Sequence, residues 1–131
     1  MNTKVLMSIS AVFLLTAGII LTFLPDEILK YSDLENTGSI LLLLQIIGAL
    51  YFGFGMLNWM IKTSLIGGIY NRPIAVANFT HFFIAGLALV KGITANPGLP
   101  KTIWIVGCIY LIFAISFGFI ILRHPLTEKK L

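Results

Sequence analysis

Residues 44–92 read LQIIGALYFGFGMLNWMIKTSLIGGIYNRPIAVANFTHFFIAGLALVKG, two long apolar runs joined by a short turn that contains a basic residue. Nearly all the polar side chains at plausible membrane depth lie in this stretch. The most prominent are Gln45, Asn58, Asn78 and His81. The apolar runs on either side contain mainly aliphatic, small and hydroxyl side chains. We therefore expect any binding site to lie in this hairpin.

The composition of the 131-residue chain indicates a membrane protein. Hydrophobic residues make up 58% and charged residues only 11%, against roughly a quarter charged in ordinary globular proteins. The formal net charge is +4, but the charges lie in loops and tails, which fits membrane orientation better than nucleic-acid binding. The single cysteine, Cys108, excludes an internal disulfide, and in an apolar run it is usually a small hydrophobic residue.

Four apolar runs have the length of membrane-spanning helices. They cover residues 4–24, 40–62, 73–92 and 101–122, and each has about the 20 residues that cross a hydrocarbon core of roughly 30 Å. Backbone groups in lipid must pair internally, and no segment alternates like a barrel strand. The sequence predicts an all-α membrane protein, a single domain built as an antiparallel bundle of four transmembrane helices.

The loop after the first run predicts a short interfacial helix. It begins with Pro25, Asp26 and Glu27 and continues with apolar residues at helical spacing. Adjacent carboxylates of this kind usually mark a solvated helix start and seldom an acid/base pair. Residues 36–39 then break the helix and offer caps for the next span.

The basic residues are distributed unequally between the two ends of the predicted bundle. One end has Lys4, Lys62, Arg72, Arg123, Lys129 and Lys130, and the other has Lys30, Lys91 and Lys101. The second end also carries the four acidic residues of the first loop. The positive-inside rule then places both termini in the cytoplasm, and we expect a multi-pass protein of a bacterial inner membrane.

Small residues predict the packing faces, because helices in lipid associate through close backbone approach. The second run supplies Gly48, Ala49, Gly53 and Gly55, of which Ala49 and Gly53 are four residues apart. The fourth run has Ala114 and Gly118 at the same spacing, and the first run has Ala11 and Gly18 seven residues apart. In the third run, residues 71, 78, 85 and 92 are polar or small, and His81 and Ala88 fall between them. We expect this face to point into the bundle. The opposite face should point away from it and contains Phe79, Phe83, Ile84, Leu87 and Val90.

No familiar constellation for catalysis or metal binding occurs. His81 has no Glu, Asp or Cys at ligand spacing, and no Ser-His-acid combination lies at membrane depth. Every acidic residue lies in the first loop or the tail, unlike in small proton-coupled exporters, and no phosphate-binding loop or nucleic-acid motif occurs. We expect no metal, cofactor or nucleic-acid partner, and an enzyme is the last of the functions considered.

Neutral hydrogen-bonding side chains remain as the candidates for a site. Such residues are rare in membranes and suggest function, although they also link helices, each contributing about 0.6 kcal/mol on average. The sequence predicts a cavity lined by Gly55, Asn58, Asn78 and His81, open toward the cytoplasmic half, with Gln45 as a further ligand-binding residue. Neutral imidazole both donates and accepts hydrogen bonds. A ligand with an apolar body and one polar head would suit this cavity.

The turn before the third run offers a second contact with lipid. Asn71 can cap the third helix, and Pro73 has no N–H to leave unpaired in its first turn. Arg72 then lies at headgroup depth, where a lipid phosphate is the expected partner. The alternative is a charge that only sets orientation.

Four short helices, an acidic first loop and a glycine-rich second helix resemble the bacterial DoxX-like group of small membrane proteins. Residues 67–73, GGIYNRP, look like a family signature. The resemblance covers the whole chain in layout and implies the same four-helix architecture. Members of that group have been linked to quinone-related electron transfer, and this sequence shows no residues that would carry such an activity.

Three functions agree with these features. The first is an intramembrane binding module for a lipid-like or other apolar small molecule. The second is an assembly protein that forms a homo-oligomer or serves as an accessory subunit of a larger membrane complex. The third is a minimal transporter, which would need a dimer to build a pathway.

Overall fold

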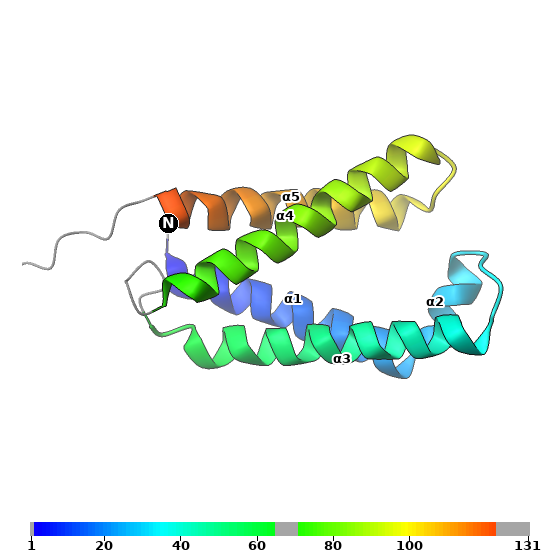
Figure 1. The fold of residues 1–131 in the computed structure, drawn as a ribbon, viewed down its shortest axis with the longest axis horizontal. Coiled ribbons are helices and arrows are strands. Elements are labelled where there is room, and N and C mark those ends of the chain that lie inside the picture. The colour runs from blue at the N-terminus through cyan, green and yellow to red at the C-terminus, as the bar shows by residue number, and fades with distance from the viewer. Residues whose placement is uncertain (1, 65–70, 123–131) are drawn as a thin grey trace, which may run out of the picture. The chain divides into compact units, whose positions relative to one another are not determined.

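The computed structural model describes residues 2–64 and 71–122, which form five α-helices and no β-strand (Figure 1). Four of these helices are long and apolar enough to cross a membrane: α1 (Thr3–Phe23), α3 (Gly38–Ile61), α4 (Arg72–Ala95) and α5 (Lys101–Leu122). The short helix α2 (Pro25–Tyr31) follows α1. The prediction of an all-helical chain with four long apolar helices is confirmed, and the helix ends agree with the predicted ones to within three residues.

The chain divides into two compact units, Met1–Thr63 and Ser64–Leu131. In the first unit α1 packs along α3, and in the second α4 packs along α5. Figure 1 shows α2 at one end of the α1–α3 pair. The predicted turn at residues 67–70 and the basic tail from residue 123 onward lie outside the described residues.

A seam of small residues joins α1 to α3, which run in opposite directions. A Cβ atom at Gly18 would stand 2.6 Å from the Phe52 amide nitrogen and 2.8 Å from the Gly48 carbonyl oxygen. A Cβ atom at Gly55 would stand 2.8 Å from the Leu15 amide nitrogen. Since real Cβ atoms do not approach backbone atoms so closely, only glycine permits this separation of the two helices.

The predicted packing residues are confirmed on α1, and on α3 they are confirmed for Gly48 and Gly55. Ala11 and Gly18 are buried, as the sequence predicts. Ala49 and Gly53, in contrast, are exposed, and nothing lies within 4 Å of a Cβ atom at Gly53. The α1–α3 seam uses the glycines seven residues apart, at positions 48 and 55, because successive helical residues are rotated by about 100° and only one stripe faces α1.

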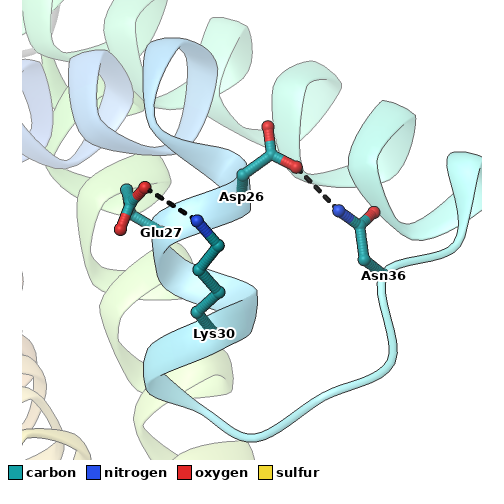
Figure 2. Close-up of polar contacts among 4 residues, drawn as sticks. All are labelled: Asp26, Glu27, Lys30 and Asn36. Carbon is teal, nitrogen blue, oxygen red and sulfur yellow. Dashed lines mark hydrogen bonds and ion pairs between the residues drawn. The ribbon is translucent and has the colours of Figure 1, made fainter.

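The start of α2 has the residues that its position requires. Pro25 occupies the first turn, where its missing N–H costs nothing, and Asp26 and Glu27 follow at the positive end of the helix dipole. Lys30 Nζ pairs with Glu27 Oε1 at 3.3 Å on the exposed surface. Asn36 Nδ2 donates to Asp26 Oδ1 at 2.7 Å and ties the following loop to the helix (Figure 2). The predicted short helix is therefore present.

The predicted N-caps of α3 and α4 differ in whether a side chain accepts the capping hydrogen bond. The Thr37 hydroxyl accepts a hydrogen bond from the Ile40 amide at 3.4 Å, so the cap predicted within residues 36–39 is confirmed. Asn71 occupies the N-cap of α4 without a side-chain cap hydrogen bond, and Pro73 lies in the first turn. The Asn71 carbonyl oxygen accepts from the Ile74 amide at 3.1 Å, so the backbone begins this helix.

α4 and α5 also run in opposite directions, and their contact face is rotated from the predicted one. Phe82 is buried and Ala88 is exposed. Phe79, expected to point away from the interior, covers Gly118, where a Cβ atom would stand 3.1 Å from its ring. The prediction for Phe79 is wrong because Phe79 lies four residues after Ala75 and three before Phe82, and residues at this spacing share one side of a helix. The buried residues of α4 are Ala75, Asn78, Phe82, Gly86 and Ile93.

Candidate functional site

A buried polar contact joins the two long helices of the first unit. Asn58 Nδ2 on α3 donates to Ser10 Oγ on α1 at 3.2 Å, and Ser10 Oγ donates to the Met7 carbonyl oxygen at 3.0 Å. Ser10, Asn58 and Met7 are all fully buried. This relay gives each polar group a partner inside an apolar interface, as buried polar groups require. Asn58 thus links the helices structurally.

The space beside Gly55, one turn before Asn58, is occupied by α1. A Cβ atom there would stand 2.9 Å from Leu15 Cγ and 3.1 Å from the Ala11 carbonyl oxygen. On the side that faces α1, Gly55 therefore permits close packing and leaves no room for a ligand atom.

His81 lies half-buried on α4 beside an aromatic cluster that α4 and α5 build together. The cluster consists of Phe82, Tyr110, Phe113 and Phe117, all buried. The imidazole centroid lies 5.0 Å from the Phe82 ring, edge to face, and 5.7 Å from the Tyr110 ring. Phe82 in turn lies 4.6 Å from Phe113 and 5.9 Å from Phe117. One imidazole at the edge of several large rings combines a polar group with an extended apolar surface.

Asn78 lies one turn before His81 on the same side of α4, since residues three apart are neighbours on a helix surface. It is fully buried, and its Nδ2 donates to the Ile74 carbonyl oxygen at 3.0 Å. Holding the amide against its own helix in this way fixes the orientation of the side chain. Asn78 and His81 therefore place an amide and an imidazole on one stretch of α4.

The predicted site residues fall into separate groups. Gly55 and Asn58 lie together on α3 in the first unit, and Asn78 and His81 lie together on α4 in the second. Gln45 is exposed on α3 and belongs to neither pair. Sequence reasoning missed Ser10 and Tyr110. Ser10 could have been found from its depth in the membrane. It lies seven residues after the start of α1, and Asn58 lies three residues before the end of α3. Because α1 and α3 run in opposite directions, the two residues lie at similar depth.

Charged residues gather at the helix ends. Lys62 Nζ, directly after α3, lies 2.9 Å from the centre of the Trp59 ring, a cation–π contact. Arg72 is exposed at the first residue of α4. Across residues 2–64 and 71–122, no group of three or more His, Cys, Asp or Glu side chains is placed to hold a metal ion.

No protein-family model, curated protein or solved structure matches the chain. The resemblance to the DoxX-like group therefore stays a prediction carried by layout alone. What the structure defines directly is a helical protein with four helices long and apolar enough to span a membrane, grouped in two pairs.

Proposed function

We propose that this chain is a multi-pass membrane protein that binds a lipid-like or other apolar small molecule through α4 and α5. The observation that supports this proposal is the position of His81, half-buried at the edge of the aromatic cluster with Asn78 one turn away. The cluster offers an apolar surface for the body of the ligand. The imidazole offers a donor or an acceptor for its polar head.

Placing these polar groups in a membrane is costly, which is why intramembrane polar residues usually serve a purpose. Ligand sites are mostly apolar and aromatic, with a few polar groups that orient the ligand. His81, Asn78 and the aromatic cluster have this composition. Gln45 lies on α3, in the first unit, so we leave it out of the proposed site.

In the proposed membrane arrangement the four long helices form an antiparallel bundle with both termini in the cytoplasm. Lys4, Lys62 and Arg72 then lie at the cytoplasmic boundary, in accordance with the positive-inside rule, and the Trp59–Lys62 contact marks the end of α3 there. The site at His81 falls in the cytoplasmic half, about 14 Å along α4 from Arg72 at 1.5 Å per residue. Arg72 at the boundary binds a lipid phosphate.

Native mass spectrometry of the purified full chain tests the proposed site. We expect the wild-type protein to retain a small molecule and the His81→Phe variant, which keeps the ring and removes the nitrogens, to retain about tenfold less. Thr80→Val is the matched control, because Thr80 is exposed beside His81 on α4 and should retain the wild-type amount. In the same spectra, Arg72→Gln should lower adducts of added phosphatidylglycerol, with Lys101→Gln as its control.

The competing interpretation is that His81 only links helices. In that case His81→Phe would lower the thermal stability of the protein in detergent and leave the amount of retained molecule unchanged. Equal retention by the wild type and His81→Phe would therefore contradict the proposed binding function, and equal phosphatidylglycerol adducts in Arg72→Gln would leave Arg72 with a topological role only.

A further inference from the structure

The charged residues of the chain are confined to the ends of the four long apolar helices and to the segments between them. The stretches without any Asp, Glu, Lys or Arg are residues 5–25, 36–61, 73–90 and 102–122. On α4, His81 lies nine residues after Arg72 and ten residues before Lys91, which is about 14 and 15 Å along the helix at 1.5 Å per residue. His81 therefore lies near the middle of an uncharged stretch about as long as a hydrocarbon core is thick.

The polar side chains nearest to His81 also carry no permanent charge. Asn78, one turn earlier, brings an amide whose Nδ2 is held by the Ile74 carbonyl oxygen. Tyr110 on α5 brings a phenol ring 5.7 Å from the imidazole. Imidazole, amide and phenol groups exchange hydrogen bonds, but an amide or a phenol gives an ionised group no opposite charge. The same holds for every arrangement of the two units, because the spans of α1 and α3 contain no charged residue either.

We infer that the ligand held at His81 carries an uncharged alcohol head on its apolar body, an inference that rests on the proposed binding function. An ionised head would lose its hydration at this depth, and the nearest permanent charges on α4 lie about 14 Å away, so its burial would be uncompensated. A hydroxyl group donates one hydrogen bond and accepts others, which matches neutral imidazole. Lipids with charged heads keep those heads at the boundary, at the level of Arg72.

Binding of tritiated oleyl alcohol to the full chain in detergent micelles, measured by scintillation proximity, tests this inference. We expect saturable binding to the wild-type protein. Oleyl sulfate and oleyltrimethylammonium have the same chain with a permanent negative or positive charge, and each should compete about tenfold more weakly than unlabelled oleyl alcohol. His81→Phe should weaken binding of the alcohol about tenfold, whereas Thr80→Val, an exposed neighbour on α4, should bind it as the wild type does.

The competition between head groups uses only the wild-type protein, so it decides the inference even where His81→Phe does not fold. Equal competition by either charged lipid would overturn the inference, as would unchanged binding of oleyl alcohol by a folded His81→Phe variant. Absence of saturable oleyl alcohol binding would also overturn it. The proposed binding function survives each of these results as long as native mass spectra show a molecule that the wild type retains and His81→Phe loses.

Discussion

The side chains of Ser10 and Asn58 illustrate how a polar residue is accommodated between apolar helices. Asn58 donates to Ser10, and Ser10 donates to the Met7 carbonyl oxygen. The Met7 carbonyl belongs to the backbone of α1. The relay therefore ends on a helix backbone group, and no additional polar side chain is left without a partner. The exposed end of α1 shows the simpler case, in which Ser8 donates to the Lys4 carbonyl oxygen at 2.8 Å within one helix. Only the first arrangement joins two helices.

Replacing Asn58 with leucine should therefore lower the free energy of unfolding. We expect a loss of about 0.6 to 1.7 kcal/mol, the range measured for hydrogen bonds between membrane helices, because Ser10 keeps its bond to Met7. Unfolding in mixed micelles measures the change. Ser8→Ala, which removes a hydroxyl bonded within its own helix, should change stability by less than about 0.5 kcal/mol. Equal losses in the two variants would argue against a role for the link between helices.

Individual polar residues could be found from the sequence, but their partners could not. Asn58, Asn78 and His81 stand out because amides and imidazoles are rare in apolar runs. Ser10 did not stand out, since a hydroxyl in a helix ordinarily bonds to its own backbone. Tyr110 was missed for a related reason: an aromatic residue in an apolar run looks like ordinary packing. Contact with His81 depends on the register of α4 against α5, which residue type does not encode.

Among the helices, α3 is distinguished by two stripes of small residues with different surroundings. Gly48 and Gly55 lie against the backbone of α1, whereas Ala49 and Gly53 are exposed. The first stripe determines how closely α1 approaches. The second leaves a surface on which a further helix can pack. Both stripes consist of residues with little or no side chain, but only the Gly48–Gly55 stripe is in contact within the α1–α3 pair.

Alanine substitutions at Gly55 and Gly53 should have different effects on the free energy of unfolding. Gly55→Ala places a methyl group 2.8 Å from the Leu15 amide nitrogen, so the helices must separate, and we expect a loss of about 1 to 3 kcal/mol in unfolding free energy. Gly53→Ala meets nothing within 4 Å and should be neutral or stabilising by up to about 1 kcal/mol through helix propensity. Unfolding in mixed micelles compares them. A neutral Gly55→Ala would show that the close approach of α1 and α3 does not contribute to stability.

The positions of the helices could be predicted from the sequence more accurately than their pairing. Pro25 and Pro73 mark helix starts because proline fits the first turn. The lengths of the apolar runs predict where the four long helices lie. Which face of α3 meets α1 could not be predicted, since apolar residues surround the helix on all sides. In α4, the seven-residue repeat suggested a face that the contacts with α5 do not follow, as Phe79 and Phe82 show.

At the scale of the whole molecule, the described acidic residues lie together in α2 and the loop after it. They are Asp26, Glu27, Asp33 and Glu35. Lys4 and Lys62 lie at the opposite end of the α1–α3 pair, since α1 begins where α3 ends. Charges of opposite sign are therefore separated along this unit by the length of a membrane-spanning helix.

The proposed orientation predicts which loops are accessible from outside the cell. In a Cys108→Ser background, cysteines at Ser32 and Asn96 should react with a membrane-impermeant thiol reagent added to intact cells, because both follow helices that end on the outer side. A cysteine at Thr127 should react only after permeabilisation. Labelling of the Thr127 cysteine in intact cells would reverse the assignment of the two sides.

The acidic α2 segment also connects the protein to the electrical state of its membrane. Asp26, Glu27, Asp33 and Glu35, with Lys30 among them, carry a net charge of about −3, and in the proposed orientation they have crossed to the outer side. An inside-negative voltage acts on each transferred charge with roughly 2.3 kcal/mol per 100 mV. The voltage therefore drives this loop outward during insertion and opposes its return. An energised membrane thus favours the outward position of this loop, and dissipating the voltage before synthesis removes that preference.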